Sequence, residues 1–187
     1  MKKWLSLFIL MAGVSLCASE YSADFIMQDK SEGIHSKGRL YFKGGNMRQE
    51  MNSGGMRTIT IIRPSEHKSW MLQPDQNTYM EMSQEDMQGA VGGADWTVED
   101  ERNAKFLGHE KVNKYTCKKY LIQDEGGEAY VWVSEELRVP IKIMGQNYQY
   151  ELVNIKKERV SDSLFQVPTG YQKFQLPNFK IPGGANF

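Results

Sequence analysis

Alternation of apolar and polar residues is the strongest pattern in this chain, and it is clearest across residues 57–82. Three short runs there each carry a pair of large apolar residues two positions apart: Ile59 and Ile61, Trp70 and Leu72, and Met80 and Met82. The clusters 64–67 and 74–77, which each begin with Pro, separate the runs. A period of two bounded by turn residues predicts a β-meander.

The same alternation extends over most of the chain. It predicts further strands at 21–28, 39–43, 47–51, 105–111, 115–123, 128–134, 140–144 and 148–156. A polar loop is expected at 29–36, and the polar stretch 94–103, with only Trp96 and Val98 as large apolar residues, has no predicted element. Short turns connect nearly all the strands, so we expect a mainly β domain of about ten strands whose twisted antiparallel sheet curls.

One helix is predicted, at residues 84–91. Ser83 followed three residues later by Asp86 matches a capping box, and Met87 and Val91 recur at helical spacing before two glycines end the pattern. A helix of this length is not stable alone, so its apolar stripe must pack on the rest of the protein. We expect it to cover the open end of the sheet.

The N-terminal residues have the features of a signal peptide. Lys2 and Lys3 precede the uncharged apolar run 4–16, which is shorter than the roughly 20 residues that a membrane-spanning helix needs. Small residues follow, and cleavage after Ala18 is the simplest prediction. We therefore expect residues 1–18 to be removed on export, and the mature chain to be periplasmic with no transmembrane segment.

Cys17 leaves a second possibility open. Residues 14–17, Val-Ser-Leu-Cys, resemble a lipobox, the signal for lipid attachment at Cys, although Leu16 stands where a small residue is usual. A lipoprotein anchored at Cys17 is therefore the alternative to a cleaved, unanchored protein. Cys117 is then the only other Cys, so no disulfide framework holds the domain and the fold must depend on its core.

Composition and charge exclude some classes of partner. The chain has 187 residues, 40% of them hydrophobic, and its formal charge is zero. Loss of residues 1–18 would remove two Lys and no acid, which leaves 21 basic and 23 acidic side chains and a net charge of −2. Such a chain has no broad basic surface for nucleic acid. We expect residues 19–171 to form a single β domain and residues 172–187 to form an extended C-terminal tail.

Catalytic and metal-binding patterns are absent from the sequence. His35, His67 and His109 fall in separate loops or turns, with no second ligand at metal-binding spacing. Cys117 has no CxxC partner and no recognisable base, and is best explained as a small core residue. We therefore predict a protein without enzyme activity, cofactor or metal ion.

Methionine is unusually frequent, and nine of the eleven Met residues lie after the predicted signal peptide. They can be ordinary core residues, or an adaptable lining for flexible apolar ligands such as acyl chains. Met80 and Met82 could also offer two thioether sulfurs to Cu(I), but no Cys or His adjoins them. The core and the acyl-chain interpretations both stay open at this stage.

Short motifs in a fixed order relate the chain to a known family. They are FKG at 42–44 with MR at 47–48, TIIRP at 60–64, WML at 70–72 leading to YMEM at 79–82, LGHEKV at 107–112, CKKY at 117–120, YVWV at 130–133, LRVPIK at 137–142 and SLFQVPTGY at 163–171. In these motifs the sequence resembles a family of small exported bacterial proteins of unknown function, allied in fold to LolA and LolB, the outer-membrane lipoprotein carriers. The resemblance implies an unclosed antiparallel β-barrel whose concave apolar face takes lipid, with short helices as a lid.

From this resemblance we expect a periplasmic binding or carrier protein for an acyl-bearing ligand, a lipid or a lipoprotein. The strand residues expected to line its concave face are Phe25, Met27, Leu40, Met47, Ile59, Ile61, Trp70, Leu72, Met80, Met82, Trp132, Tyr150 and Leu152. Met87 and Val91 would make the contact from the lid. The alternative is a structural or interaction module with a filled core, which would present an edge strand or its tail to another envelope protein.

Overall fold

The computed structural model describes residues 20–31, 33–82, 96–124 and 127–174, which form a mainly β structure. The strands are β1 (Glu20–Asp29), β2 (Ile34–Lys43), β3 (Asn46–Ser53), β4 (Met56–Arg63), β5 (Lys68–Gln73), β6 (Thr78–Met82), β7 (Lys105–Val112), β8 (Tyr115–Asp124), β9 (Gly127–Ser134), β10 (Pro140–Met144), β11 (Tyr148–Lys157) and β12 (Gln172–Lys173). The helices are α2 (Val98–Asn103) and three 3-10 turns, η1 (Pro64–Glu66), η2 (Pro74–Gln76) and η3 (Asp162–Phe165). Within these ranges no helix has the length and apolar character needed to cross a membrane.

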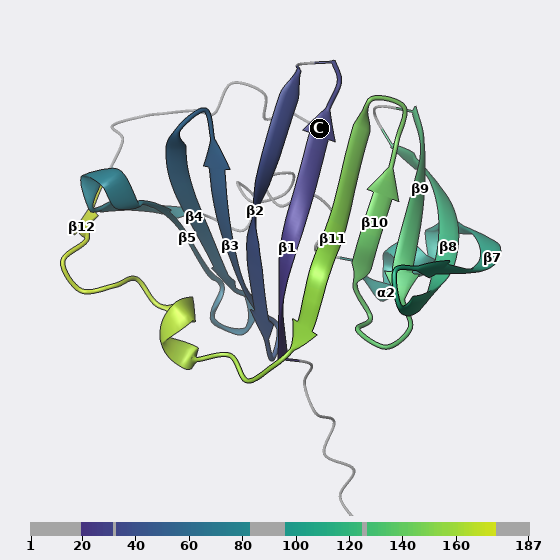
Figure 1. Ribbon diagram of the computed structural model, residues 1–187. Coiled ribbons are helices and arrows are strands. Elements are labelled where there is room, and N and C mark those ends of the chain that lie inside the picture. Colours follow the sequence, from purple (N-terminus) through teal and green to yellow (C-terminus); the bar gives the residue numbers. More distant parts are fainter. Residues whose placement is uncertain (1–19, 32, 83–95, 125–126, 175–187) are drawn as a thin grey trace, which may run out of the picture.

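All the described strands belong to one sheet, in the order β12-β6-β5-β4-β3-β2-β1-β11-β10-β9-β8-β7 (Figure 1). Strands β1 to β6 form one antiparallel meander and β7 to β11 form a second, and the pairing of β1 with β11 joins them. Of the strands that the structure describes, only β12 runs parallel to its neighbour, β6. The two ends of the sheet do not pair with each other in the described residues, so this is the curled, unclosed sheet predicted from the sequence.

Turns that begin with Pro connect β4, β5 and β6, as the sequence predicts. Pro suits the first position of η1 and η2 because that position needs no N–H donor. The turns end at His67 and Asn77, whose φ angles of 52° and 51° lie in the left-handed region. The backbone N–H of each donates to the carbonyl of the Pro three residues earlier, at 3.0 and 3.2 Å. These closed turns fix the register of the meander.

Two connections differ from the prediction. The segment 29–36, expected to be a loop, is partly strand, because β1 continues to Asp29 and β2 begins at Ile34. Helix α2 lies in a stretch with no predicted element and starts from a capping box: the Asp100 N–H donates to Thr97 Oγ1 at 3.1 Å, and the Thr97 N–H donates to the Asp100 carboxylate at 2.7 Å. The predicted helix at 84–91 lies outside the described residues.

Register assigns each strand residue to one of two faces of the sheet, because directly paired residues of antiparallel strands point to the same side. Phe25 pairs with Leu152 on β11 and with Gly38 on β2, and the side that they share is called the Phe25 face. Counting outward along the pairs, Ile61 and its β3 partner Arg48 lie on the opposite side, called the Ile61 face.

Three irregularities in pairing bend the sheet between β1 and β7. One lies where β11 passes β1, next to Asn154 with its left-handed φ of 52°; one lies between Pro140 and Lys142 on β10; and one lies between Phe106 and Gly108 on β7. A bulge adds an unpaired residue to one strand, which bends that strand and increases the local twist. The bulges that curl the sheet therefore lie in this half of it.

In the described part of the chain, buried apolar side chains form three clusters. The largest is built around Phe25 and Tyr150, whose rings stack with centroids 6.1 Å apart, and it extends to β8 and β9. The second lies on the Ile61 face and joins Ile61 to Phe165 of η3. The third is centred on Val131 of β9 and includes Ala104, which directly follows α2. The core is therefore distributed over both faces of one sheet.

The chain after β11 runs back across the Ile61 face, and residues 158–165 are called the strap (Figure 1). Charged side chains of the sheet fix its backbone. Lys43 Nζ donates to the carbonyl of Val160 at 3.0 Å, and Arg48 Nη1 donates to the carbonyl of Leu164 at 3.0 Å. These two carbonyls lie outside the β-sheet, so no neighbouring strand can donate a hydrogen bond to them. The Lys and Arg side chains supply the donors that they need.

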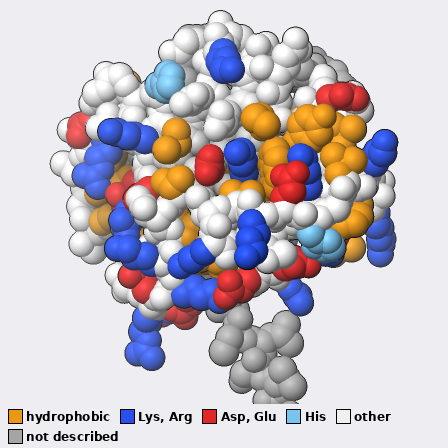
Figure 2. Space-filling model, turned by 45° about the vertical axis from the view of Figure 1, so that its right-hand side comes forward, with side chains coloured by type: hydrophobic (Ala, Val, Ile, Leu, Met, Phe, Trp, Pro, Cys, Tyr) orange, Lys and Arg blue, Asp and Glu red, His pale blue; other side chains and the backbone are white. Residues whose placement is uncertain are grey.

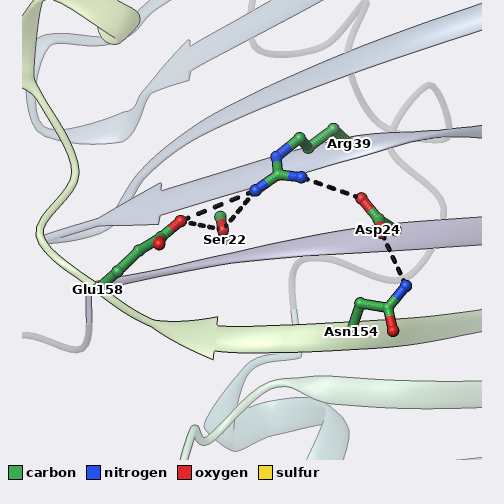
Figure 3. A network of polar contacts seen from close by, with 5 residues as sticks. All are labelled: Ser22, Asp24, Arg39, Asn154 and Glu158. Carbon is green, nitrogen blue, oxygen red and sulfur yellow. Dashed lines mark hydrogen bonds and ion pairs between the residues drawn. The ribbon is translucent and has the colours of Figure 1, made fainter.

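A polar network at the start of the strap ties it to β1 and β2 (Figure 3). Arg39 lies between two carboxylates, 3.4 Å from Asp24 and 3.8 Å from Glu158, and donates to Ser22 Oγ at 3.0 Å. Ser22 in turn donates to Glu158, and Asn154 Nδ2 donates to Asp24 at 2.9 Å. The network satisfies Ser22, which is fully buried, and anchors the chain as it leaves the sheet.

Replacement of Phe165 by Ala tests how far the strap stabilises the fold. Phe165 is 2% exposed and fills the apolar cluster on the Ile61 face, so we expect Phe165→Ala to lower the free energy of unfolding by about 3–5 kcal/mol. Urea denaturation measures the change. The matched control is Phe174→Ala, because Phe174 is 50% exposed and should change stability by no more than about 0.5 kcal/mol. Equal effects of the two substitutions would contradict a structural role for the strap.

Candidate apolar binding site

Eight of the thirteen strand residues expected to line one concave surface do share the Phe25 face. They are Phe25, Met27, Leu40, Met47, Met80, Met82, Tyr150 and Leu152. In the middle of the sheet these side chains are packed into one cluster, with Phe25, Leu40 and Leu152 only 0%, 3% and 1% exposed. The protein's own side chains therefore fill the centre of the expected concavity. Met87 and Val91, expected in the lid, lie outside the described residues.

Four of the expected residues point to the opposite side of the sheet. They are Ile59, Ile61, Trp70 and Leu72. The prediction that they share a surface with Phe25 is wrong, and the hairpin between β3 and β4 gives the reason. Its register pairs Met47 with Ile62, so Ile62 and not its neighbour Ile61 lies on the Phe25 face. On the Ile61 face, Ile59, Ile61 and Leu72 are buried in one cluster with Val160 and Phe165 of the strap. Trp70 is partly buried and packs against this cluster.

Trp132 is the fifth residue whose pairing differs from the expectation. It pairs with Lys142, one position before the β10 residue that pairs with Tyr150. Its indole N–H donates to Glu110 at 2.6 Å, and the ammonium groups of Lys119 and Lys142 lie 4.8 and 5.3 Å from its ring centre. Figure 2 shows how lysine, arginine and acidic side chains interrupt the hydrophobic surface at this end of the molecule. Trp132 is therefore buried beneath charged side chains and does not line an open apolar hollow.

An open apolar groove lies farther along the Phe25 face, between strands β8 to β10 and the segment that carries α2. Its volume of about 570 Å³ falls within the roughly 300–1,000 Å³ of typical ligand pockets. Its apolar lining consists of Trp96, Ala104, Leu121, Ile122, Val131, Pro140 and Ile143. Asp100, Asn103, Lys105 and Gln123 complete the lining. The apolar part of the groove suits a hydrocarbon group.

The pairing of three strands builds the floor of the groove. Val131 on β9 pairs with Tyr120 on β8 and with Ile143 on β10, and Ile143 pairs with Tyr150 on β11. Ile122 follows Tyr120 by two residues and so points to the same side. The groove thus belongs to the Phe25 face. None of its residues was among those predicted, although the alternation within β8 and β9 is the signal that could have identified them.

Polar contacts hold α2 beside the groove. Glu101 accepts hydrogen bonds from Lys118 Nζ, at 2.8 Å, and from the hydroxyl of Tyr120, and these three side chains are called the Glu101 latch. The Trp96 ring packs on Tyr120 with centroids 5.2 Å apart. The hydrogen bond from Lys118, followed by that from Tyr120, lowers the pKa of Glu101, so the latch is charged at neutral pH.

The groove offers binding surface and little chemistry. Asp100, one of its polar lining residues, is engaged in the α2 capping box. The Cys117 thiol is buried outside the groove, and burial raises its pKa, which disfavours the nucleophilic thiolate. Within the described ranges no three His, Cys, Asp or Glu side chains gather as metal ligands would. The arrangement can therefore exclude water from an apolar group and orient it.

Two other hollows are less suited to this role. A bowl of about 490 Å³ on the Ile61 face has Ile26, Met51 and Val153 in its lining. It also carries two ion pairs, Asp24 with Arg39 at 3.4 Å and Glu50 with Arg57 at 3.5 Å. A smaller one of about 280 Å³ lies where β12 meets β6. The first presents paired charges and the second is too small for a long acyl chain, so the groove beside α2 is the better candidate.

The Glu101 latch should weaken in acid. The pKa of Glu101 is lower in the folded protein than in the unfolded chain, so the stabilisation is complete above the unfolded value and is lost as the pH falls through the folded value. At pH 7 we expect Glu101→Gln to lower Tm by about 1–3 °C, and this difference from the parent protein should shrink as the pH falls below about 4.3, the ordinary pKa of Glu. Glu99→Gln removes an exposed carboxylate from the same first turn and controls for the loss of charge near the helix N-terminus, so it should lower Tm less than Glu101→Gln does. A pH-independent effect of Glu101→Gln would contradict the latch.

Comparison with solved structures supports the fold. An uncharacterized conserved protein from Thermus thermophilus is similar with a TM-score of 0.59 and 14% identity, over 84% of this chain and 90% of that chain. PNGF-II has a TM-score of 0.49 at 13% identity, over 79% of this chain and 30% of that one. MucB in complex with MucA(peri) has a TM-score of 0.36 at 9% identity, over 88% of this chain and 60% of that one. The last two likenesses are too distant to carry an argument.

The sequence itself identifies a family. A search of the curated proteins gives no match. The family model described as a domain of unknown function, DUF4412, matches residues 24–139, which span the sheet from β1 to the turn before β10. This agrees with the family of unknown function that the sequence motifs resemble. The chain belongs to the DUF4412 family.

Proposed function

We propose that this protein is a non-enzymatic binding or carrier protein of the periplasm, and that it takes the acyl chain of a lipid or lipoprotein in the groove beside α2. The observation that carries the proposal is the groove itself, about 570 Å³ in volume and lined by seven apolar side chains on the Phe25 face. Burial of hydrocarbon there is favourable by roughly 25 cal/mol for each Å² of apolar surface removed from water.

Two further observations support a ligand at this end of the sheet. The sheet is unclosed, so its face remains accessible where a closed barrel would seal it. Ile122 and Ile143 are only partly buried, whereas Phe25 and Leu152 in the middle of the same face are completely packed. The apolar surface that remains available is thus concentrated around the groove.

The signal-peptide features of residues 1–18 support a place in the periplasm. A cleaved, unanchored protein suits a carrier that moves between membranes, and a lipid-anchored form at Cys17 would suit a receptor at one membrane. A mass spectrum of the mature N-terminus distinguishes the two forms. We favour the unanchored carrier, because Leu16 departs from the small residue that lipid attachment prefers.

A second candidate function is an interaction module of the cell envelope. The filled centre of the Phe25 face favours it, because Phe25, Leu40 and Tyr150 leave no hollow there. The edge strand β7 would be the docking element, since it exposes Phe106 and Leu107. This module would bind its partner without taking up a lipid, so ligand uptake separates the two candidates.

Filling the groove should weaken the uptake of an acyl chain. Ile122 lines the groove, and the larger side chain of Ile122→Trp would occupy the space available to a ligand. We expect the wild-type protein to bind dansylaminoundecanoic acid and enhance its fluorescence. Ile122→Trp should weaken the affinity for this probe at least about tenfold, because roughly two methylene groups of the probe would no longer be buried.

The matched control is Ile26→Trp, because Ile26 is an exposed β1 residue near the charged bowl and lies away from the groove. It should bind the probe as the wild type does. Circular dichroism and Tm should show that both variants fold. Absence of probe binding by the wild type, together with no lipid in extracts of protein purified from periplasm, would overturn the carrier proposal and favour the interaction module.

A further inference from the structure

The bowl on the Ile61 face carries more cationic groups than its own carboxylates can neutralise. Lys37, Arg39 and Arg57 bring three positive charges to its lining, and Asp24 and Glu50 bring two negative ones. Positive charge that is left unmatched in a concave surface attracts anions, because the walls of the hollow focus its electric field. The contacts of each charged group therefore show whether the bowl can hold an anion.

Both carboxylates of the bowl are matched by arginines other than Arg57. The buried Arg48 donates from Nε to the Glu50 carboxylate at 2.8 Å, whereas the half-exposed Arg57 reaches the same carboxylate only at 3.5 Å. Asp24 lies 3.4 Å from Arg39. Arg57 is thus left with a long contact to a carboxylate that already has a closer cation, and most of its hydrogen-bonding capacity remains available.

Two further donors of the lining have no partner. Within the described ranges, neither the ammonium group of Lys37 nor the side-chain amide of Asn52 makes a hydrogen bond or an ion pair. Lys37 pairs with Asn52 on β3, and Asn52 pairs with Arg57 on β4. Because paired residues point to the same side, these three side chains form one line across three strands, which is called the Asn52 row.

The spacing of the Asn52 row suits one shared ligand. Neighbouring strands lie about 4.8 Å apart, so the long side chains of Lys37 and Arg57 can both lean toward a group above Asn52. An apolar surface adjoins the row: Ile26 pairs with Lys37, is 41% exposed and lines the bowl together with Val153. The bowl therefore offers two cations and an amide donor beside aliphatic surface.

We propose that the bowl binds a phosphate monoester, with its phosphate oxygens on Lys37, Asn52 and Arg57 and its carbon skeleton against Ile26. At neutral pH such a phosphate carries close to two negative charges and three strong acceptor oxygens, which match two cations and three donor groups. The Arg57 guanidinium can donate two parallel hydrogen bonds to it. The inference goes beyond the proposed function, because the bowl lies on the face of the sheet opposite to the groove.

Titration calorimetry with sn-glycerol 3-phosphate at low salt tests the site. We expect the wild type to bind it, and Lys37→Gln and Arg57→Gln each to weaken the affinity about three- to tenfold, as expected for loss of one exposed charge-assisted hydrogen bond. The matched controls are Lys111→Gln on β7 and Arg102→Gln on α2, which remove the same charges from exposed positions. They should bind within about twofold of wild type, because distant exposed charges are screened.

The charge and the amide of the site are tested separately. Acetate, with a single charge, should bind the wild type at least about tenfold more weakly than glycerol 3-phosphate. Asn52→Asp keeps the shape of an exposed side chain but places a carboxylate in the row, so it should weaken phosphate binding at least about tenfold without lowering Tm. In ¹⁵N-labelled protein the Asn52 side-chain amide signal, identified by its loss in Asn52→Asp, should shift when glycerol 3-phosphate is added.

Two sources supply this chemistry, a soluble phosphate ester and the head group of a phosphatidate in a membrane. Flotation with phosphatidylcholine vesicles that contain phosphatidic acid separates them. Vesicle binding that is lost in Arg57→Gln assigns the site to the lipid head group, and binding of glycerol 3-phosphate without vesicle binding assigns it to a soluble ester. Either result supports the phosphate site.

Three results would overturn the proposal: no binding of glycerol 3-phosphate or of the vesicles by the wild type, equal effects of Arg57→Gln and Arg102→Gln, or equal affinities for acetate and glycerol 3-phosphate. None of them bears on the uptake of an acyl chain by the groove. Conversely, Ile122→Trp, which fills the groove, should bind glycerol 3-phosphate as the wild type does. Failure of one site is therefore distinguishable from failure of the other.

Discussion

The pairing of β1 with β11 is the constraint on which the rest of the structure depends, because among the described strands it is the one pairing that joins the two meanders. Phe25 stands at this junction and is completely buried. Its ring packs over Gly38 on one side and stacks on Tyr150 on the other. A Cβ at position 38 would lie 2.7 Å from that ring and 1.9 Å from the carbonyl oxygen of Glu50, so only Gly allows the close packing.

This junction divides the molecule into parts with different roles. On the first meander, the strap and its apolar cluster cover the Ile61 face, and Lys43 and Arg48 supply the hydrogen bonds that its irregular backbone requires. On the second meander, bulges bend the strands and the Phe25 face opens into the groove. Stability is thus concentrated at the centre and under the strap, and the accessible apolar surface lies at the other end.

The sequence predicts the strands well because alternation and turn chemistry are local properties. Pro-initiated turns and a period of two locate β4 to β6 closely. The face to which each strand residue points is harder to predict, because it depends on the register of the hairpins. Whichever of Ile61 and Ile62 pairs with Met47 lies on the Phe25 face, and the structure pairs Met47 with Ile62. Helix α2 buries none of its own residues, so it has no apolar stripe to reveal it, and only the capping box at Thr97 signals it. The groove is lined by Pro140, where the pairing of β10 with β9 shifts its register, and no local sequence pattern indicates this shift.

The way in which α2 is held bears on how a ligand would enter. The strap is fastened by a buried Phe, whereas α2 depends on the partly exposed Glu101 latch and on the contact of Trp96 with Tyr120. Elements with few buried apolar contacts open at the lowest free-energy cost. A hydrocarbon in the groove would add apolar contacts beneath this weakly held segment. Ligand binding and docking of α2 would then stabilise each other, because linkage between two equilibria is reciprocal.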